Sequence, residues 1–158
     1  MIVVQNPLNA LTIMFRTIDT ATRLIDSGIV PIPLYPGTKR PIGEGWQLAT
    51  MPSVAQLSDL WPDEEGRNIG ALMGHSSDNT QGFDFDVYGA WARWRGEYKP
   101  PETTTIFTAR GIRTIYKTTP DAIQSANIID NGMRVGELLG NGHQMVMPPS
   151  RLANGFAD

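Results

Sequence analysis

Three acidic residues are the part of this sequence whose types and spacing could do chemistry. Asp84 and Asp86 lie in the segment GFDFDVYG, and Glu137 lies in VGELLGNGHQMVMPPS. Two carboxylates held side by side repel each other unless one is protonated or a cation lies between them. Proteins bind hard divalent cations such as Mg²⁺ with a few carboxylates together with substrate phosphates. A third carboxylate from a second strand would complete such a site, of the kind found in polymerases and nucleases.

The acidic pair requires an extended strand to position it. Side chains at i and i+2 of a strand point to the same face, so we expect Asp84 and Asp86 to project together. The opposite face would bury three apolar side chains, those of Phe83, Phe85 and Val87. Alternation of charged and apolar residues is also the ordinary pattern of a strand with one solvated face, and a single glutamate between apolar residues has the same plain explanation. The acidic residues therefore become informative only if neighbouring strands bring them together.

Side chains that could bind phosphate occur in several other segments. They are Lys39 and Arg40 in the loop PGTKRP, Arg113 and Lys117 in the predicted strand RTIYKT, and Ser150 after the Pro-Pro pair. Guanidinium and ammonium groups bind phosphate oxygens, and a loop framed by glycine and proline holds them with little loss of entropy. Because the two strand cations are an even number of positions apart, both could face the carboxylates. Solvated loop positions explain the loop cations and the serine equally well.

Composition bounds the class of protein. The chain has 158 residues, enough for one domain, and its 41% hydrophobic and 18% charged residues are typical of globular proteins. The net charge of −3 argues against a broadly basic surface that coats nucleic acid, while a local basic groove remains compatible with it. The absence of cysteine excludes disulfides and thiolate zinc sites. Without a signal peptide or an apolar span of about 20 residues, we expect a cytoplasmic protein that makes no contact with a membrane.

Periodicity predicts an α+β domain with helices early and a largely antiparallel sheet later. The expected helices are 15–27, 53–61, 90–98 and 121–127. The expected strands are 29–35, 68–74, 83–88, 103–109, 113–118, 133–139 and 143–148. Pro31 and Pro33 make the first of these an edge strand or an irregular one, because proline cannot donate to the ladder. We expect the last two strands to pair with each other across the Gly-Asn-Gly turn at 140–142.

The ordered segments resemble the N-terminal primase–polymerase domain of bifunctional replication proteins from plasmids, phages and prophages, within the archaeo-eukaryotic primase superfamily. The resemblance begins near Ala21 and runs through GIVPIPLYPGTKRPIGEGWQ, NIGALMG, GFDFDVYG, TARGIRTIY and ELLGNGHQMVMPPS. It implies an α+β, primase-like fold, with a mixed and largely antiparallel sheet flanked by helices. It also implies that residues 1–158 form a single domain. The ending RLANGFAD stops without a closing element, which is compatible with a natural terminus and also with a fragment truncated at its C-terminal end.

The resemblance also implies a site. Asp84 and Asp86 match the acidic pair of the family and Glu137 its third acidic position, where Asp is usual, so these three would be the catalytic ligands of two Mg²⁺ or Mn²⁺ ions. The family carries a histidine that contacts the phosphates of the incoming nucleotide, and here Arg113 stands in its place in Gly111–Arg113. Arginine binds phosphate as a fixed cation and cannot act in neutral form. Further phosphate-binding candidates are Lys39, Arg40, Lys117 and Ser150.

The implied activity is metal-dependent transfer of nucleotides from nucleoside triphosphates to a primer or initiating nucleotide on a DNA template. A helicase domain or protein would be a further partner. Four other functions are compatible with the same residues. They are a catalytically impaired nucleotide- or nucleic-acid-binding module of a larger replication protein, a metal-dependent nuclease, a nucleotide-sugar transferase that uses Asp-x-Asp, and a structural domain with solvated acids. Arg113 in place of the histidine favours the first of these.

Overall fold

The computed structural model describes residues 16–153 and 155–156, which form an α+β fold with two main antiparallel sheets. The helices are α1 (Thr17–Asp26), α2 (Leu57–Leu60) and α3 (Tyr88–Tyr98). The first sheet has the order β1-β2-β8, from Pro31–Leu34, Asn68–Leu72 and Gln144–Met147. The second has the order β4-β5-β3-β7-β6, from Thr105–Phe107, Ile112–Lys117, Thr80–Phe85, Met133–Leu139 and Ala126–Asp130. A short pair follows, β9 (Arg151–Leu152) with β10 (Gly155–Phe156). The predicted fold class is confirmed.

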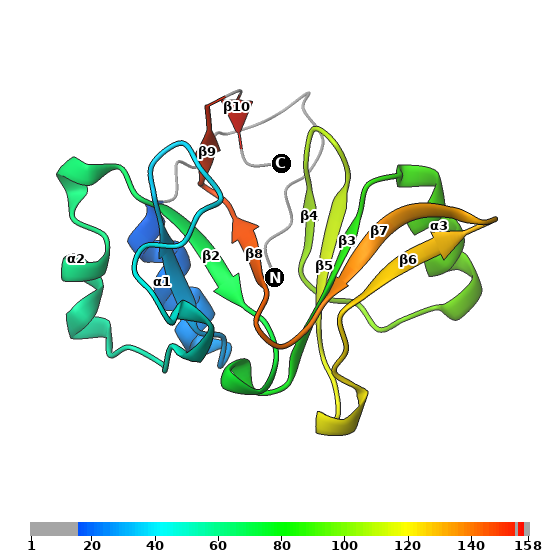
Figure 1. The fold of residues 1–158 in the computed structure, drawn as a ribbon, viewed down its shortest axis with the longest axis horizontal. Helices are drawn as coiled ribbons and strands as arrows, with labels where there is room; N and C mark the ends of the chain where they lie inside the picture. The colour runs from blue at the N-terminus through cyan, green and yellow to red at the C-terminus, as the bar shows by residue number, and fades with distance from the viewer. Residues whose placement is uncertain (1–15, 154, 157–158) are drawn as a thin grey trace.

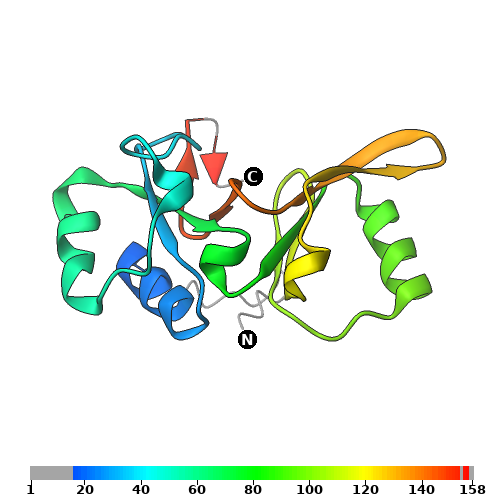
Figure 2. The same cartoon turned by 60° about the horizontal axis from the view of Figure 1, so that its bottom comes forward.

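The two sheets divide the molecule into two halves that lie side by side (Figure 1). The three-stranded sheet lies with α1 and α2 in one half, and the five-stranded sheet lies with α3 in the other, as the rotated view in Figure 2 also shows. The chain crosses between the halves from β2 to β3 and returns from β7 to β8. No helix among the described residues is long and apolar enough to cross a membrane.

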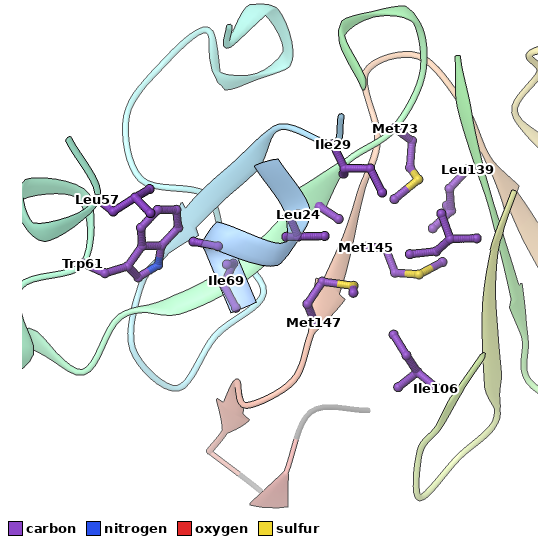
Figure 3. Packing of buried hydrophobic residues seen from close by; sticks show 13 residues of the cluster. Leu24, Ile29, Leu57, Trp61, Ile69, Met73, Ile106, Leu139, Met145 and Met147 are labelled. Atoms are coloured by element: carbon purple, nitrogen blue, oxygen red, sulfur yellow. The ribbon is translucent and has the colours of Figure 1, made fainter. Parts of the chain in front are cut away.

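A hydrophobic cluster joins the two halves (Figure 3). From the first half it takes Leu24 of α1 and Met145 and Met147 of β8, and from the second half Ile115 and Leu139. One face of the five-stranded sheet is therefore turned toward the first half. Further along β5 the same face carries position 113, two residues before Ile115, so polar residues begin where the apolar contact ends.

The opposite face of the five-stranded sheet is covered by α3. Phe85 and Trp91 are buried there, and the Phe83 ring lies 5.2 Å from that of Trp94 between centroids. The prediction for the two phenylalanines is thus confirmed. The prediction for Val87 is wrong, because β3 ends at Phe85 and Val87 is the 44% exposed N-cap of α3.

Two predictions near the C-terminus are also wrong. The segment 121–127 is no helix: a 3-10 turn at Pro120–Ala122 leads into β6, and β6 pairs with β7. Their connection is Asn131–Gly132, with φ of 50° and 77°, which is the turn chemistry that tight hairpins favour. The strands β7 and β8 do not pair with each other, because the turn at 140–142 carries the chain from one sheet to the other. The expected edge position of β1 is confirmed.

Candidate functional site

The pairing of β3 with its two neighbours gathers the chemically interesting residues. Asp84 lies directly opposite Arg113 on β5 and directly opposite Glu137 on β7. Side chains opposite each other on one face of a sheet have Cβ atoms about 5 Å apart. Asp86 follows immediately after the end of β3, and its backbone N–H donates to the carbonyl oxygen of Val135 on β7 (2.8 Å). Three carboxylates and a guanidinium thus share one patch of the five-stranded sheet.

Asp84 is the most enclosed of the three acids. Its side chain is 29% exposed, compared with 56% for Asp86 and 47% for Glu137. Burial raises the pKa of Asp84 above its ordinary value, and the neighbouring Asp86 carboxylate adds to the rise. The positive charges of Arg113 and Lys39 oppose it. Lys39, on the loop of the other half, is therefore close enough to act on the site electrostatically.

Arg113 connects the site to the other sheet. The residue is only 5% exposed, and its Nε donates to Asp84 Oδ2 over 3.2 Å. Its Nη1 donates to the carbonyl oxygen of Val146 on β8 at 3.4 Å. The structure therefore places this guanidinium against a carboxylate and a backbone acceptor. Its contact with nucleotide phosphate stays a prediction.

A bulge in β7 changes which side chains share the acidic face. Ile128 pairs with Gly136 and Ile129 with Arg134, so Val135 is an extra residue on β7. Val135 is buried under α3, on the opposite face. A bulge of this kind redirects the side chains around it, and here it brings Arg134 to the side of the sheet that carries the acids.

Gly136 allows the strands to approach closely at the bulge. A Cβ atom on Gly136 would lie 2.2 Å from the carbonyl oxygen of Asp84, a contact too short for any side chain. The close approach of β7 to β3, the strand that carries Asp84, therefore requires glycine at position 136.

Arg134 is a site residue that the sequence analysis missed. Its Nη2 donates to Glu137 Oε1 at 2.5 Å, and its Nη1 lies 3.5 Å from Asp86 Oδ2. Its Nε donates to Asn127 Oδ1 at 3.1 Å. On a regular strand, residues three apart face opposite sides, so alternation would separate Arg134 from Glu137. The bulge brings Arg134 and Glu137 to the same face. No residue type in the segment MRVGELL predicts a bulge.

The other predicted phosphate-binding residues are placed less closely. The Arg40 guanidinium lies over the Tyr35 ring, 5.3 Å from its centroid. Lys117 lies four residues beyond Arg113 on β5, where it pairs with Asp78 and lines a separate cavity of about 590 Å³ beside α1. The hydroxyl of Ser150 is buried, accepts from a backbone N–H of β2 (2.9 Å) and donates to a carbonyl of the same strand (3.1 Å). In this structure Ser150 holds the chain after β8 against β2.

The donor set suits a hard divalent cation in type. Carboxylate oxygens from neighbouring strands are the ligands that Mg²⁺ and Mn²⁺ prefer. Across the described ranges 16–153 and 155–156, no three His, Cys, Asp or Glu side chains are gathered in a geometry that would hold an ion. The carboxylates contact guanidinium groups instead. The positive charge between Asp86 and Glu137 is that of Arg134. The types of donor fit a divalent metal ion, and binding one requires these side chains to turn from their guanidinium partners.

Comparison with known protein families identifies the family of this chain. Residues 21–157, which are most of the chain, match the model of the family described as bifunctional DNA primase/polymerase, N-terminal. The match spans both main sheets and all three acidic residues. No match was found among the curated proteins.

Proposed function

The chain belongs to the family of N-terminal domains of bifunctional DNA primase/polymerases, and from this premise we propose that it transfers nucleotides from nucleoside triphosphates to a DNA primer or initiating nucleotide, with Mg²⁺ or Mn²⁺. The observation that carries the proposal is the register of β3, which sets Asp84 opposite Glu137 with Asp86 two residues further along. Family membership supports a primase/polymerase type of function. The metal dependence and the turnover are our proposal.

In the proposed reaction Asp84, Asp86 and Glu137 would hold the divalent metal ions. The chemistry supplied by such ions would be a lower pKa of the attacking 3′-hydroxyl and neutralisation of the triphosphate and the leaving pyrophosphate. The chain contributes rigidity, because Asp84 and Glu137 project from paired strands of a sheet. Arg113 orients the Asp84 carboxylate through its Nε, and Val146 fixes the guanidinium in turn. The positive charge of Lys39, from the opposite half, acts on Asp84, and in the proposed reaction it would help to neutralise the triphosphate.

A primer-extension assay with Mg²⁺ or Mn²⁺ tests this proposal. We expect the wild-type protein to incorporate nucleotides on a primed DNA template and the double variant Asp84→Ala, Asp86→Ala to incorporate none. Asp130→Ala is the matched control, because Asp130 is an acid of the same sheet that pairs with Arg93 away from the site. Urea denaturation would verify that all three proteins are folded. Undiminished incorporation by the double variant would refute the assignment of the metal ligands.

One observation favours a second candidate, a nucleotide- or DNA-binding module without turnover. Each of the three carboxylates already has a guanidinium partner, so their charge is compensated without a metal ion. The resemblance also implies that Arg113 stands where the family has a histidine. In this case the protein would bind single-stranded DNA or nucleoside triphosphates, and primer extension and primer initiation would both be absent with either metal.

A further inference from the structure

Arg134 contacts the site with its whole guanidinium group. Its three nitrogens face Glu137 (2.5 Å), Asp86 (3.5 Å) and the side-chain oxygen of Asn127 (3.1 Å). Two of these partners are the proposed metal ligands. A single arginine therefore supplies the positive charge between Asp86 and Glu137 that a divalent ion would supply when bound.

The two arginines of the site differ in how firmly they are held. The Arg113 side chain is 6% exposed and is fixed between two sheets. The Arg134 side chain is 48% exposed, and both of its acidic partners are about half exposed. Exposed ion pairs are weak, since water solvates the separated charges well. Arg134 can thus leave its carboxylates at a small cost, whereas Arg113 cannot.

We infer that Arg134 is an exchangeable counter-ion, which neutralises Asp86 and Glu137 until a divalent metal ion replaces it and which then binds the triphosphate of the incoming nucleotide. This inference rests on the proposed function. Arginine suits the second task because its planar fork binds phosphate oxygens through two parallel hydrogen bonds. The β7 bulge suits it as well, because it brings Arg134 to the face of the sheet that carries Glu137.

The inference predicts two effects of opposite sign. Without Arg134, a metal ion no longer has to displace two exposed ion pairs, each worth up to about 1 kcal/mol, so metal affinity should rise about five- to thirtyfold. Binding of the triphosphate in the presence of metal should weaken by about tenfold or more, because a charged hydrogen-bond donor is lost. An arginine that only stabilised the hairpin would not change the two affinities in opposite directions.

The test measures both affinities directly, without catalysis. Free Mn²⁺ is titrated by electron paramagnetic resonance against wild type, Arg134→Met, and Arg93→Met as control. Arg93 pairs with Asp130 at the same hairpin, so its removal also deletes an exposed arginine pair but leaves the three acids untouched. An α,β-imido nucleoside triphosphate is then titrated calorimetrically at saturating Mn²⁺. Arg134→Lys keeps the charge and loses the fork, so its Mn²⁺ affinity should stay near wild type while its triphosphate affinity falls.

The outcomes separate this inference from the proposed function. Tighter Mn²⁺ binding and weaker triphosphate binding by Arg134→Met, with Arg93→Met unchanged in both, is the expected result. Unchanged or weaker Mn²⁺ binding, or unchanged triphosphate binding, by Arg134→Met would overturn the inference. The double variant Asp84→Ala, Asp86→Ala serves as the reference. If it bound Mn²⁺ as well as wild type, the proposed metal site itself would be wrong.

Discussion

Replacing Arg113 by methionine tests whether this buried guanidinium holds the acidic strand and links the two sheets. Methionine keeps a long apolar side chain and removes every charged contact. The variant loses the 3.2 Å bond to Asp84 and the 3.4 Å bond to the Val146 carbonyl. It also leaves the Asp84 carboxylate beside Asp86 without its closest positive charge.

The size of the loss follows from burial. Breaking a buried ion pair by removing one partner costs about 3–5 kcal/mol of stability. The Asp84 side chain is 29% exposed, so water can solvate part of its charge. We therefore expect the free energy of unfolding to fall by about 2–3 kcal/mol, a large share of the roughly 5–15 kcal/mol typical of a domain. The control is Arg93→Met, whose arginine is 60% exposed and whose loss should cost at most about 1 kcal/mol.

Urea denaturation followed by tryptophan fluorescence measures both variants, and a double-mutant cycle with Asp84→Asn isolates the pair. Because asparagine removes the partly buried charge, Arg113→Met should cost less in the Asp84→Asn background than in wild type. We expect a coupling free energy of about 1–2 kcal/mol for side chains in direct contact. A coupling below about 0.5 kcal/mol, or an Arg113→Met loss no larger than that of Arg93→Met, would refute this account of the pair.

Three further predictions concern other parts of the structure. Gly136→Ala should lower the free energy of unfolding by about 2 kcal/mol or more, because its Cβ would clash with a carbonyl oxygen of β3. Gly96→Ala is the contrasting variant: the position lies in open space within α3, so alanine should raise the free energy of unfolding by about 0.5–1 kcal/mol. Ser150→Ala should cost about 2 kcal/mol in urea denaturation, because it orphans a buried N–H and a carbonyl of β2. The Arg16 backbone N–H holds the pKa of Asp19 below its ordinary value. Asp19→Asn should therefore lower the melting temperature at neutral pH, and this difference should vanish as the pH falls through the folded-state pKa; a difference independent of pH would contradict it.

The local chemistry of the site was predictable where strand periodicity alone decides it. The alternation around Asp84 correctly predicts that Phe83 and Phe85 lie on the face opposite the acids, where Phe85 is buried and Phe83 is partly buried. It failed at Val87, because periodicity does not show where a strand ends and a helix cap begins. The family match over residues 21–157 confirms the resemblance seen in the ordered motifs.

Pairing between distant segments was less predictable. The Asn131–Gly132 dipeptide is a strong hairpin signal, and it requires a strand directly before it, which conflicts with the helix expected over 121–127. The turn at 140–142 has equally good turn residues, yet it joins strands of different sheets, which local chemistry cannot reveal. Arg134 was missed because an extra residue in β7 reverses the alternation, and such a bulge depends on the register of both neighbouring strands.

The proposed function requires Asp84, Asp86 and Glu137 to converge on divalent metal ions. A crystal structure of the protein with Mn²⁺ and an α,β-imido nucleoside triphosphate would show this convergence, because manganese can be located by its anomalous scattering. We predict anomalous density within about 2–2.5 Å of oxygens from all three carboxylates, as expected for such ligands, with Arg134 turned from them to the triphosphate. Manganese bound elsewhere, or none bound while the carboxylates keep their arginine partners, would contradict the account.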